Sequence, residues 1–399
     1  MLKNKIQNMS FIDPNGSNIK EVKAFILKVI NILLKKISNA EKHPPLPKKL
    51  QNIDKFNLND LPIAESKILD HIKAIIKNSM NASNPFYLGH MDSLPTTMSI
   101  VGDIICSTIN NNMLSKDTAP IITEIEKKIT NNLAKKFNLG QNSGGVMLSG
   151  GSLSNIQAIA IARNRILGTF DKGLTGLKRK PYIFASEEAH TSIQKAAMVL
   201  GLGVNSVVPI ETNKEGTMKV SVLDKSIKEK IKDNGFPFCI IATAGTTITG
   251  GIDDLQEISK IANKYKLWMH TDAVYGGALI FSNQFKSKLK GIENSDSIAF
   301  NPQKWLYITK TCSVLLLKNK KYFYSDFFTP LPYVLKENQE YHQGEITLQG
   351  TRYPDALKLW LSLQHLGNFS YSEIIKNSYK YTSLFKKKLL EIKNIKISC

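Results

Sequence analysis

The chain of 399 residues contains few cysteines, and they stand far apart. Cys106, Cys239, Cys312 and Cys399 form no CxxC or CxxxC pair. Structural zinc sites use closely spaced cysteines, so neither such a site nor another metal centre is predicted. Cys239 and Cys312 stand in apolar, strand-like runs and are expected to be buried thiols. This usage is typical of a reducing, cytoplasmic setting.

Long apolar runs are also absent. No window approaches the ~18–20 consecutive apolar residues that a membrane-spanning helix requires, so no membrane span is predicted. Residues 1–10 are polar and lack the pattern of a secretory signal, so none is expected. The composition, 42% hydrophobic and 22% charged, is that of a globular protein and excludes wholesale disorder.

Arginine is scarce although the formal net charge is +20. The basic residues are lysines apart from Arg163, Arg165, Arg179 and Arg352. Arginine is the side chain that reads guanine and phosphate with two hydrogen bonds, and no nucleic-acid-binding motif accompanies the charge. Nucleic acid is therefore not predicted as a partner.

The first 90 residues read as a helical segment with a proline-rich linker. Residues 18–39 place apolar side chains at helical spacing with lysines opposite, and 63–79 repeat the pattern. The first helix is expected to pack on a partner or core rather than lie on a membrane surface. The linker contains KHPPLP at 42–47, and prolines stiffen such a stretch.

Residues 91–350 read as one large α/β domain. Amphipathic helices alternate with short, apolar, β-branched runs, which predicts a mostly parallel sheet covered by helices on both faces. The expected helices are 119–136, 152–166, 191–202 and 254–265, and the expected strands are 182–185, 204–210, 238–244, 267–271, 297–300 and 313–317. Residues 351–399 add helices at 353–366 and 370–392 and a strand-like run at 395–398.

Several short motifs stand where a strand ends. The stretch 149–155, SGGSLSN, enters a helix, and its glycines and free amides suit an anion, although a simple N-capped helix would look the same. Asp272 ends the strand before AVYGG, where α/β proteins bind ligands, or it caps the next loop. Lys304 follows the strand SIAF and stands in NPQKW, where a partly apolar setting would make it a Schiff-base nucleophile.

Two further motifs complete the pattern. His190 in EEAHTS follows another strand and can stack on a planar ligand or cap a helix, and AGTT at 244–247 supplies hydroxyls. A phosphate cradle, a stacking imidazole, a strand-end carboxylate and a strand-end lysine are together what pyridoxal 5′-phosphate requires. Each motif is weak alone, and their combination predicts this cofactor.

With these motifs the chain resembles the group II pyridoxal-phosphate-dependent decarboxylases, the family of the glutamate, aromatic amino acid, cysteine sulfinate and diaminobutyrate decarboxylases. The resemblance runs from about residue 84 to 399 and rests on SGGSxSN, EEAHxS, AGTTxxGxID, HTDAxYGG and NPxKW. It implies the aspartate-aminotransferase-like fold, called fold type I, and a homodimer with its active site at the interface.

The resemblance also implies residue roles. Lys304 would form the Schiff base, Asp272 would hold the pyridine nitrogen protonated, and His190 would stack on the ring. The phosphate end and ring hydroxyl would lie near Leu153 (through its backbone), Ser154, Thr247 and Asn301, with Ser152 and Thr246 as close neighbours.

In this family a loop tyrosine of the partner subunit returns the proton. The corresponding segment here is about 330–350, where Tyr333 and Tyr341 are both candidates, with Tyr333 preferred. The loop 86–95 resembles the part that lines the partner's substrate pocket, with His90 and Asp92 as candidate polar contacts.

The chain departs from the family pattern in three places. Gln303 stands where the family has histidine, so it can hydrogen-bond phosphate but carries no charge. Val274 replaces an alanine where the ring packs. The chain stops where the family's small C-terminal domain begins, so 351–399 is expected to be the start of a truncated domain.

The resulting hypothesis is decarboxylation of an L-amino acid to the amine and CO2. Gly276 and Gly277 favour an acidic or aliphatic substrate. Two alternatives stay open: another fold type I lyase or a transaminase, and a truncated, non-catalytic relative that acts through binding.

Overall fold

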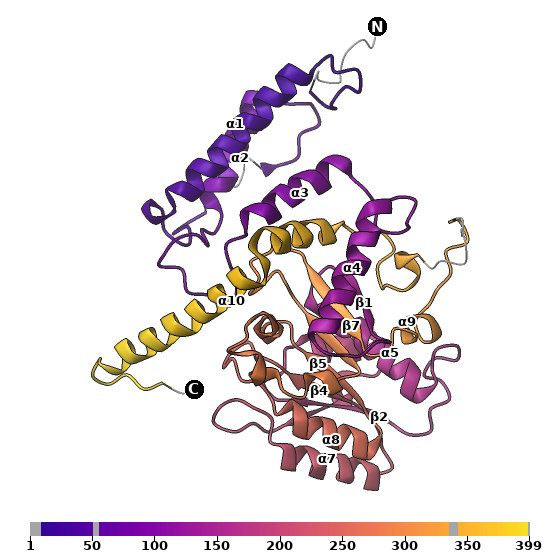
Figure 1. Cartoon of the computed structure of the whole chain (residues 1–399). Coiled ribbons are helices and arrows are strands. Elements are labelled where there is room, and N and C mark those ends of the chain that lie inside the picture. The colour runs from indigo at the N-terminus through magenta and orange to yellow at the C-terminus, as the bar shows by residue number, and fades with distance from the viewer. Residues whose placement is uncertain (1–8, 51–55, 335–341, 398–399) are drawn as a thin grey trace. The chain divides into compact units, whose positions relative to one another are not determined.

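The computed structural model describes residues 9–50, 56–334 and 342–397. These form two compact units, residues 1–94 and 95–399 (Figure 1). Within the described ranges no helix combines the length and the apolar character that crossing a membrane demands.

The first unit is built on two helices. Helices α1 (Ile19–Ser38) and α2 (Glu65–Asn78) form where the amphipathic spacing predicts helices, and they contact each other. The connection is held by Asn81, whose Nδ2 donates to the carbonyls of Ala40 and His43 at 2.8 and 3.1 Å. Only Val22 of α1 is buried, so most of the helix's apolar side chains remain exposed.

The second unit contains a seven-stranded sheet of order β1-β7-β6-β5-β4-β2-β3. Strand β7 is antiparallel to both its neighbours, and the other pairs are parallel. The strands are β1 (Gly144–Leu148), β2 (Pro181–Ser186), β3 (Val207–Ile210), β4 (Phe236–Thr243), β5 (Trp268–Asp272), β6 (Ser297–Phe300) and β7 (Ser313–Leu317).

Helices cover both faces of this sheet, which confirms the predicted α/β architecture (Figure 1). One buried cluster joins the sheet to α4 (Pro120–Lys136), α7 (Val220–Lys232), α8 (Leu255–Tyr265) and α10 (Asp355–Leu390). The other joins it to α5 (Gly151–Leu167), α6 (Ser192–Val199) and α9 (Tyr322–Ser325). Strand residues enter the two clusters in turn, as Ile240 and Ile241 of β4 do, because successive side chains point to opposite faces.

A buried ion pair fixes strand β1. The two guanidinium nitrogens of Arg352 lie 2.9 and 3.1 Å from the carboxylate of Glu126 on α4, and both side chains are almost fully buried. Arg352 also donates to the carbonyl of Met147, and Glu126 accepts the Met147 N–H. Charges buried this deeply need direct pairing, and although Arg352 Nε has no partner among the described residues, these bonds hold β1 and the turn after it in place.

The ends of two predicted elements differ in the structure. The strand expected at 204–210 begins only at Val207, because Gly203 at φ +78° turns the chain and residues 204–206 form a single 3₁₀ turn. The strand expected at 395–398 does not form over residues 395–397, which are irregular and pair with no described strand. A lone strand has no partner for its backbone groups.

The two helices expected near the C-terminus form as α10, which Gly367 interrupts at φ +61°, ψ −179°. Helix α3 (Thr97–Ile109) packs against α10, and its Gly102 leaves no room for a side chain, because a Cβ there would lie 2.6 Å from the Cα of Lys358.

Candidate active site

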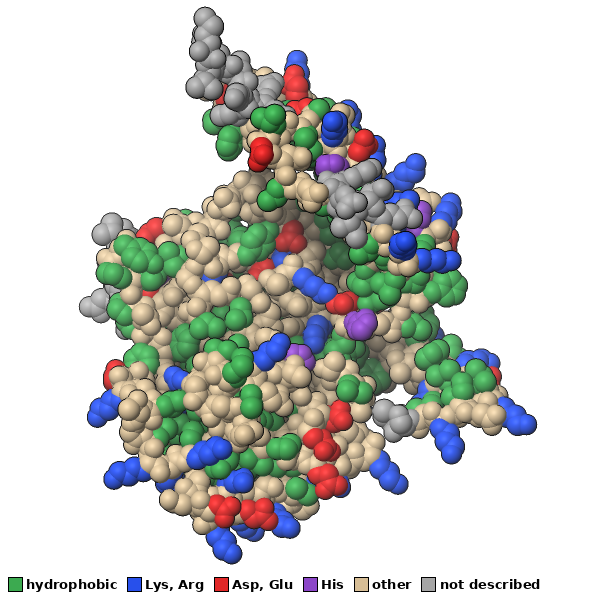
Figure 2. All heavy atoms as spheres, turned by 180° about the vertical axis from the view of Figure 1, so that it is seen from behind, with side chains coloured by type: hydrophobic (Ala, Val, Ile, Leu, Met, Phe, Trp, Pro, Cys, Tyr) green, Lys and Arg blue, Asp and Glu red, His purple; other side chains and the backbone are tan. Residues whose placement is uncertain are grey.

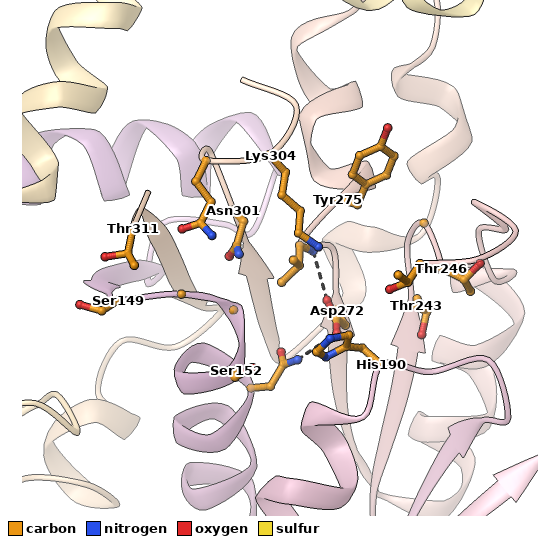
Figure 3. A pocket seen from close by; sticks show the side chains of 17 residues that line it. Ser149, Ser152, His190, Thr243, Thr246, Asp272, Tyr275, Asn301, Lys304 and Thr311 are labelled. Carbon is orange, nitrogen blue, oxygen red and sulfur yellow. Dashed lines mark hydrogen bonds between the residues drawn. The ribbon is translucent and has the colours of Figure 1, made fainter. Parts of the chain in front are cut away.

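The motif residues meet at one edge of the sheet. Strands β1, β2, β4, β5 and β6 run in the same direction, so the segments that follow them leave from the same edge. These segments line a cavity of about 360 Å³ (Figure 3). Its lining residues are Ser149, Gly150, Gly151, Ser152, Asn155, His190, Thr243, Gly245, Thr246, Thr247, Asp272, Val274, Tyr275, Asn301, Gln303, Lys304 and Thr311.

The glycine turn before α5 opens the helix N-terminus to this cavity. Gly150 adopts φ +105°, which favours glycine. A Cβ on Gly151 would lie 2.8 Å from Val274 Cγ2 and 3.0 Å from Asn301 Nδ2. Glycine at 151 therefore makes room for Val274, and the unpaired amides of the first helical turn remain available to an anion.

Asp272 stands at the carboxyl end of β5, and its carboxylate is held in place on both oxygens. Oδ2 accepts from Asn155 Nδ2 at 2.9 Å, and Oδ1 accepts the Val274 N–H at 3.2 Å. The second Nδ2 hydrogen of Asn155 serves Ser192 Oγ, also at 2.9 Å. Asn155 thus orients the carboxylate from the side of α5.

His270 in turn holds Asn155. Its Nε2 lies 3.0 Å from Asn155 Oδ1, and its Nδ1 lies 2.8 Å from Ser297 Oγ. Asn155 Oδ1 can only accept, so His270 Nε2 is the donor and Nδ1 of the neutral ring accepts from the Ser297 hydroxyl. Ser297 Oγ in turn accepts from the indole N–H of Trp268 at 2.8 Å. The imidazole proton is therefore on Nε2. The hydrogen bonds then run as a chain of donors to acceptors, from the Trp268 indole through Ser297, His270 and Asn155 to the Asp272 carboxylate.

Burial keeps this imidazole neutral. His270 is fully buried, and the loss of solvent lowers its pKa to about 4. A neutral ring with Nε2 protonated donates to Asn155 Oδ1, and this leaves Nδ2 of the same amide to donate to Asp272.

His190 follows β2 and is tied to the same network through Ser192. Its Nδ1 accepts the Ser192 backbone N–H at 3.2 Å and lies 2.9 Å from Ser192 Oγ. Since Nδ1 accepts, Nε2 carries the proton in the neutral ring. The ring is exposed on the cavity, where a planar ligand would meet it.

Lys304 enters from the loop after β6, and in Figure 3 its side chain extends toward Asp272. The loop is braced by aromatic packing next to the lysine. The rings of Trp305 and Tyr275 stack with centroids 4.9 Å apart and planes inclined by 12°. Tyr275 lines the cavity, and burial raises its phenol pKa, so its hydroxyl stays protonated at neutral pH.

Polar side chains tie the loop after β6 to β7 and α5. Asn301 Oδ1 accepts from Ser313 Oγ at 2.5 Å, and Ser313 Oγ lies 2.7 Å from Ser154 Oγ. Gln303 Oε1 accepts the Cys312 N–H at 2.6 Å, so one end of this amide is occupied by backbone.

Of the predicted cofactor residues, Leu153 and Ser154 are the two that do not line the cavity. Leu153 is partly buried against the core cluster that includes α5, and Ser154 Oγ forms a hydrogen bond with Ser313 Oγ instead. The remaining ones do line it: Ser152, His190, Thr246, Thr247, Asp272, Val274, Asn301, Gln303 and Lys304.

The other predicted residues lie elsewhere. Tyr333 is 73% exposed and is not a lining residue, and Tyr341 lies outside the described residues. His90 and Asp92 belong to the first unit, where His90 adopts φ +60°.

The site also contains polar side chains for which the sequence analysis predicts no role, although most of them belong to the motifs. Asn155, His270 and Ser192 are letters of the quoted motifs, and they form the support of Asp272 and His190. Thr243 ends β4, and its buried Oγ1 has no hydrogen-bond partner among the described residues. The only sequence signal for these groups was their position inside or beside a motif.

The donor set fits pyridoxal phosphate. The glycine turn and α5 N-terminus suit a phosphate, Asp272 suits a pyridine nitrogen and Lys304 suits an aldehyde. Thr243 Oγ1, buried and without a described partner, is a polar group that a ligand in the cavity would satisfy. A mostly parallel sheet with these groups at its carboxyl edge defines the class: a pyridoxal phosphate protein of fold type I.

The chain belongs to the pyridoxal-dependent decarboxylase family, whose conserved-domain model matches residues 47–398. Its relatives include the L-aspartate decarboxylase of Metarhizium robertsii, 31% identical over 86% of this chain and 70% of the relative. The acidic amino acid decarboxylase of Bos taurus is 29% identical over 82% of this chain. The L-2,4-diaminobutyrate decarboxylase of Acinetobacter baumannii is 32% identical over 78%. The chain spans 64% of the length of each of the latter two.

Solved structures agree with the fold. Mouse CSAD in its apo form superimposes with a TM-score of 0.88 and 26% identity, covering 95% of this chain and 82% of that one. Oryza sativa TDC with PLP and tryptamine also has a TM-score of 0.88, at 21% identity, and supports the fold alone. The predicted family, fold and cofactor are confirmed.

Proposed function

We propose that this protein decarboxylates an L-amino acid to the corresponding amine and CO2. The observation that carries the proposal is the meeting of Lys304, Asp272 and His190 in one cavity, each from a different strand end. The family and the names of its relatives support decarboxylation over other reactions of the fold.

Each of these side chains has a definite task. The cofactor, when bound, supplies an aldehyde for an amino group and a ring that accepts the electron pair left by CO2. Lys304 Nζ is the amino group that would hold the cofactor's aldehyde. Asp272 holds a proton on the ring nitrogen, and Asn155 and the Val274 N–H keep its two oxygens oriented. His190 would cover one face of the ring, and the N-terminus of α5 would bind the phosphate.

The proton that replaces CO2 would come from a tyrosine of the partner subunit in a homodimer, Tyr333 or Tyr341. Support comes from Tyr333, which is 73% exposed rather than turned into its own cavity. The ends of its segment are fixed: Glu345 carboxylate oxygens accept the N–H groups of Leu331 and His342 at 3.2 and 2.9 Å.

The substrate is proposed to be acidic. Relatives named for aspartate and for acidic amino acids support this choice, and the chain's excess of lysine suits an anionic substrate. A cytoplasmic location is proposed as well, because Cys106, Cys239 and Cys312 are buried free thiols, as a reducing compartment allows.

The test combines a spectrum with a substrate panel. Purified protein with pyridoxal phosphate should show a visible absorption band that borohydride removes, and Lys304→Ala should lack it, whereas the exposed-lysine control Lys290→Ala should keep it. CO2 release should be largest with L-aspartate, L-glutamate or cysteine sulfinate, against L-2,4-diaminobutyrate and L-tryptophan. Keto acid or aldehyde without CO2 would refute decarboxylation, and release from tryptophan alone would refute the acidic substrate.

A further inference from the structure

A second cavity, of about 300 Å³, lies at the opposite end of β1 from the cofactor cavity. It is formed where the start of β1 meets α4 and α9, elements that adjoin in Figure 1. Its lining residues are Lys127, Thr130, Asn131, Gly144, Gly145, Lys320, Phe323, Tyr324, Gln343 and Ile346. None of them lines the cofactor cavity.

Gln343 gives this cavity an unused polar group. The residue is only 6% exposed, and its side-chain Oε1 is buried without a hydrogen-bond partner among the described residues. A buried acceptor left unpaired is unfavourable, and native structures rarely keep one without a ligand or water to satisfy it. The group that would satisfy Oε1 is a donor, such as a hydroxyl.

Two lysines give the same cavity a positive charge. Lys127 Nζ lies 3.1 Å from Glu124 Oε1, which offsets part of its charge. Lys320 lies across Gly144, where a Cβ would come within 3.2 Å of the lysine Cβ and 3.3 Å of its Cδ. The missing side chain at Gly144 therefore leaves room for the lysine stem. Among the described residues that line the cavity, two are cationic and none carries a carboxylate.

We propose that this cavity binds a small phosphomonoester bearing a hydroxyl group. The phosphate would lie against Lys320 and Lys127, since lysine binds phosphate as a point charge, and the hydroxyl would donate to Gln343 Oε1. This assignment is independent of the proposed decarboxylation, because it uses no residue of the cofactor cavity. The site is connected to that cavity: residues 343–349 lead to Gln349, which accepts the Ser149 N–H at 3.0 Å.

Isothermal titration calorimetry on the protein saturated with pyridoxal phosphate tests the proposal, since the phosphate cradle of the cofactor is then filled. The probes are glycerol 3-phosphate, n-propyl phosphate, which lacks the hydroxyls, and glycerate, a hydroxylated carboxylate. Glycerol 3-phosphate should bind at least five times more tightly than either of the others. The cofactor absorption band, recorded throughout, should not change.

Variants distinguish binding in this cavity from a general attraction of anions to the positively charged protein. Lys320→Gln, at an exposed position, should weaken glycerol 3-phosphate binding at least tenfold, whereas Lys128→Gln, an exposed neighbour outside the lining, should change it less than twofold. Gln343→Met should remove the preference for glycerol 3-phosphate over n-propyl phosphate. No heat of binding, equal affinity in Lys320→Gln, or tighter binding of glycerate would overturn the proposal.

Discussion

The carboxyl edge of the sheet and helix α1 of the first unit are built in contrasting ways. At the sheet edge each functional side chain is fixed by its neighbours, as Asp272 is by Asn155 and by the Val274 N–H. On α1 the apolar side chains remain largely exposed, as Leu34 is at 58% and Ile26 at 46%. At the sheet edge the groups that hold Asp272 belong to the same chain, whereas α1 has apolar surface that a partner would bury.

The basic side chains on the surface are not arranged as a binding site would require. On the face drawn in Figure 2, lysine and arginine side chains are scattered and interspersed with acidic ones. A nucleic-acid-binding surface would gather them into a stripe or patch. On that face, therefore, the basic side chains are not concentrated in one site.

Among the substitutions at the sheet edge, Asp272→Asn is expected to lower CO2 release the most. An amide cannot hold a proton on the ring nitrogen, so CO2 release should fall roughly 10²–10⁴-fold, the range for losing a positioned proton-transfer group. Cofactor binding, followed by the absorption band, should persist because Lys304 remains. An activity loss of less than tenfold would contradict the assigned role.

Asn155→Ala should cost less, about a hundredfold in CO2 release. It leaves Asp272 Oδ2 and His270 Nε2 without their partner, and small misplacements of a catalytic group carry costs of that size. A purely structural role would lower stability without altering the cofactor spectrum, so the spectrum against pH is the decisive readout. The matched control is Asn164→Ala on the same helix, whose bonds serve Thr169 and Asp326 away from the cavity.

The sequence could predict the residues that touch a ligand but not those that support them. Lys304, Asp272 and His190 follow recognisable strands, and strand direction places them together. Asn155 and His270 form a pair only because α5 and β5 pack face to face, a contact between residues 115 positions apart. No local pattern contains that information.

The same limit applies to the fold. Elements with strong apolar periodicity were predicted, whereas β1 was missed because two glycines precede only three apolar residues, Val146, Met147 and Leu148. Helix α7 was missed although Leu223 and Ile227 keep helical spacing, since a lysine-rich face obscured it. The run at 395–397 is β-branched, but a strand requires a neighbour that periodicity cannot supply.

The pH dependence of stability offers a finer test of the His270 support. Its pKa is about 4 in the folded protein and near 6.5 unfolded, so the unfolded state binds the proton first as pH falls. The resulting stabilisation is complete above pH 6.5 and is lost toward pH 4, by about 3 kcal/mol. His270→Gln should abolish this contribution in denaturant titrations.

Buried carboxyls act in the opposite direction and must be separated from the histidine. Burial raises the pKa of Asp253 and of Asp355 to about 6, so their protonated forms favour folding and stability falls as pH rises from about 4 to 6. The wild-type profile should therefore be flatter than that of His270→Gln, whose stability should decline over this range. Parallel profiles would show that His270 titrates normally. The imidazole NMR signal checks this directly, because its change with pH should have its midpoint near pH 4 rather than near 6.5.

Substitutions in α1 are expected to have the smallest effect on the cofactor cavity, and so to distinguish α1 most clearly from the sheet edge. Replacing Ile26 and Leu34 together by glutamate places charge on the exposed apolar face, which should dissociate the proposed homodimer because buried charge opposes association. Lys28→Glu, on an exposed position of the same helix, is the control and should leave the assembly intact. Sedimentation velocity measures the oligomeric state, and the absorption band per chain should stay unchanged. If α1 instead helped to form the cofactor cavity, the band would be lost with the dimer, and the two regions would be one functional unit rather than two.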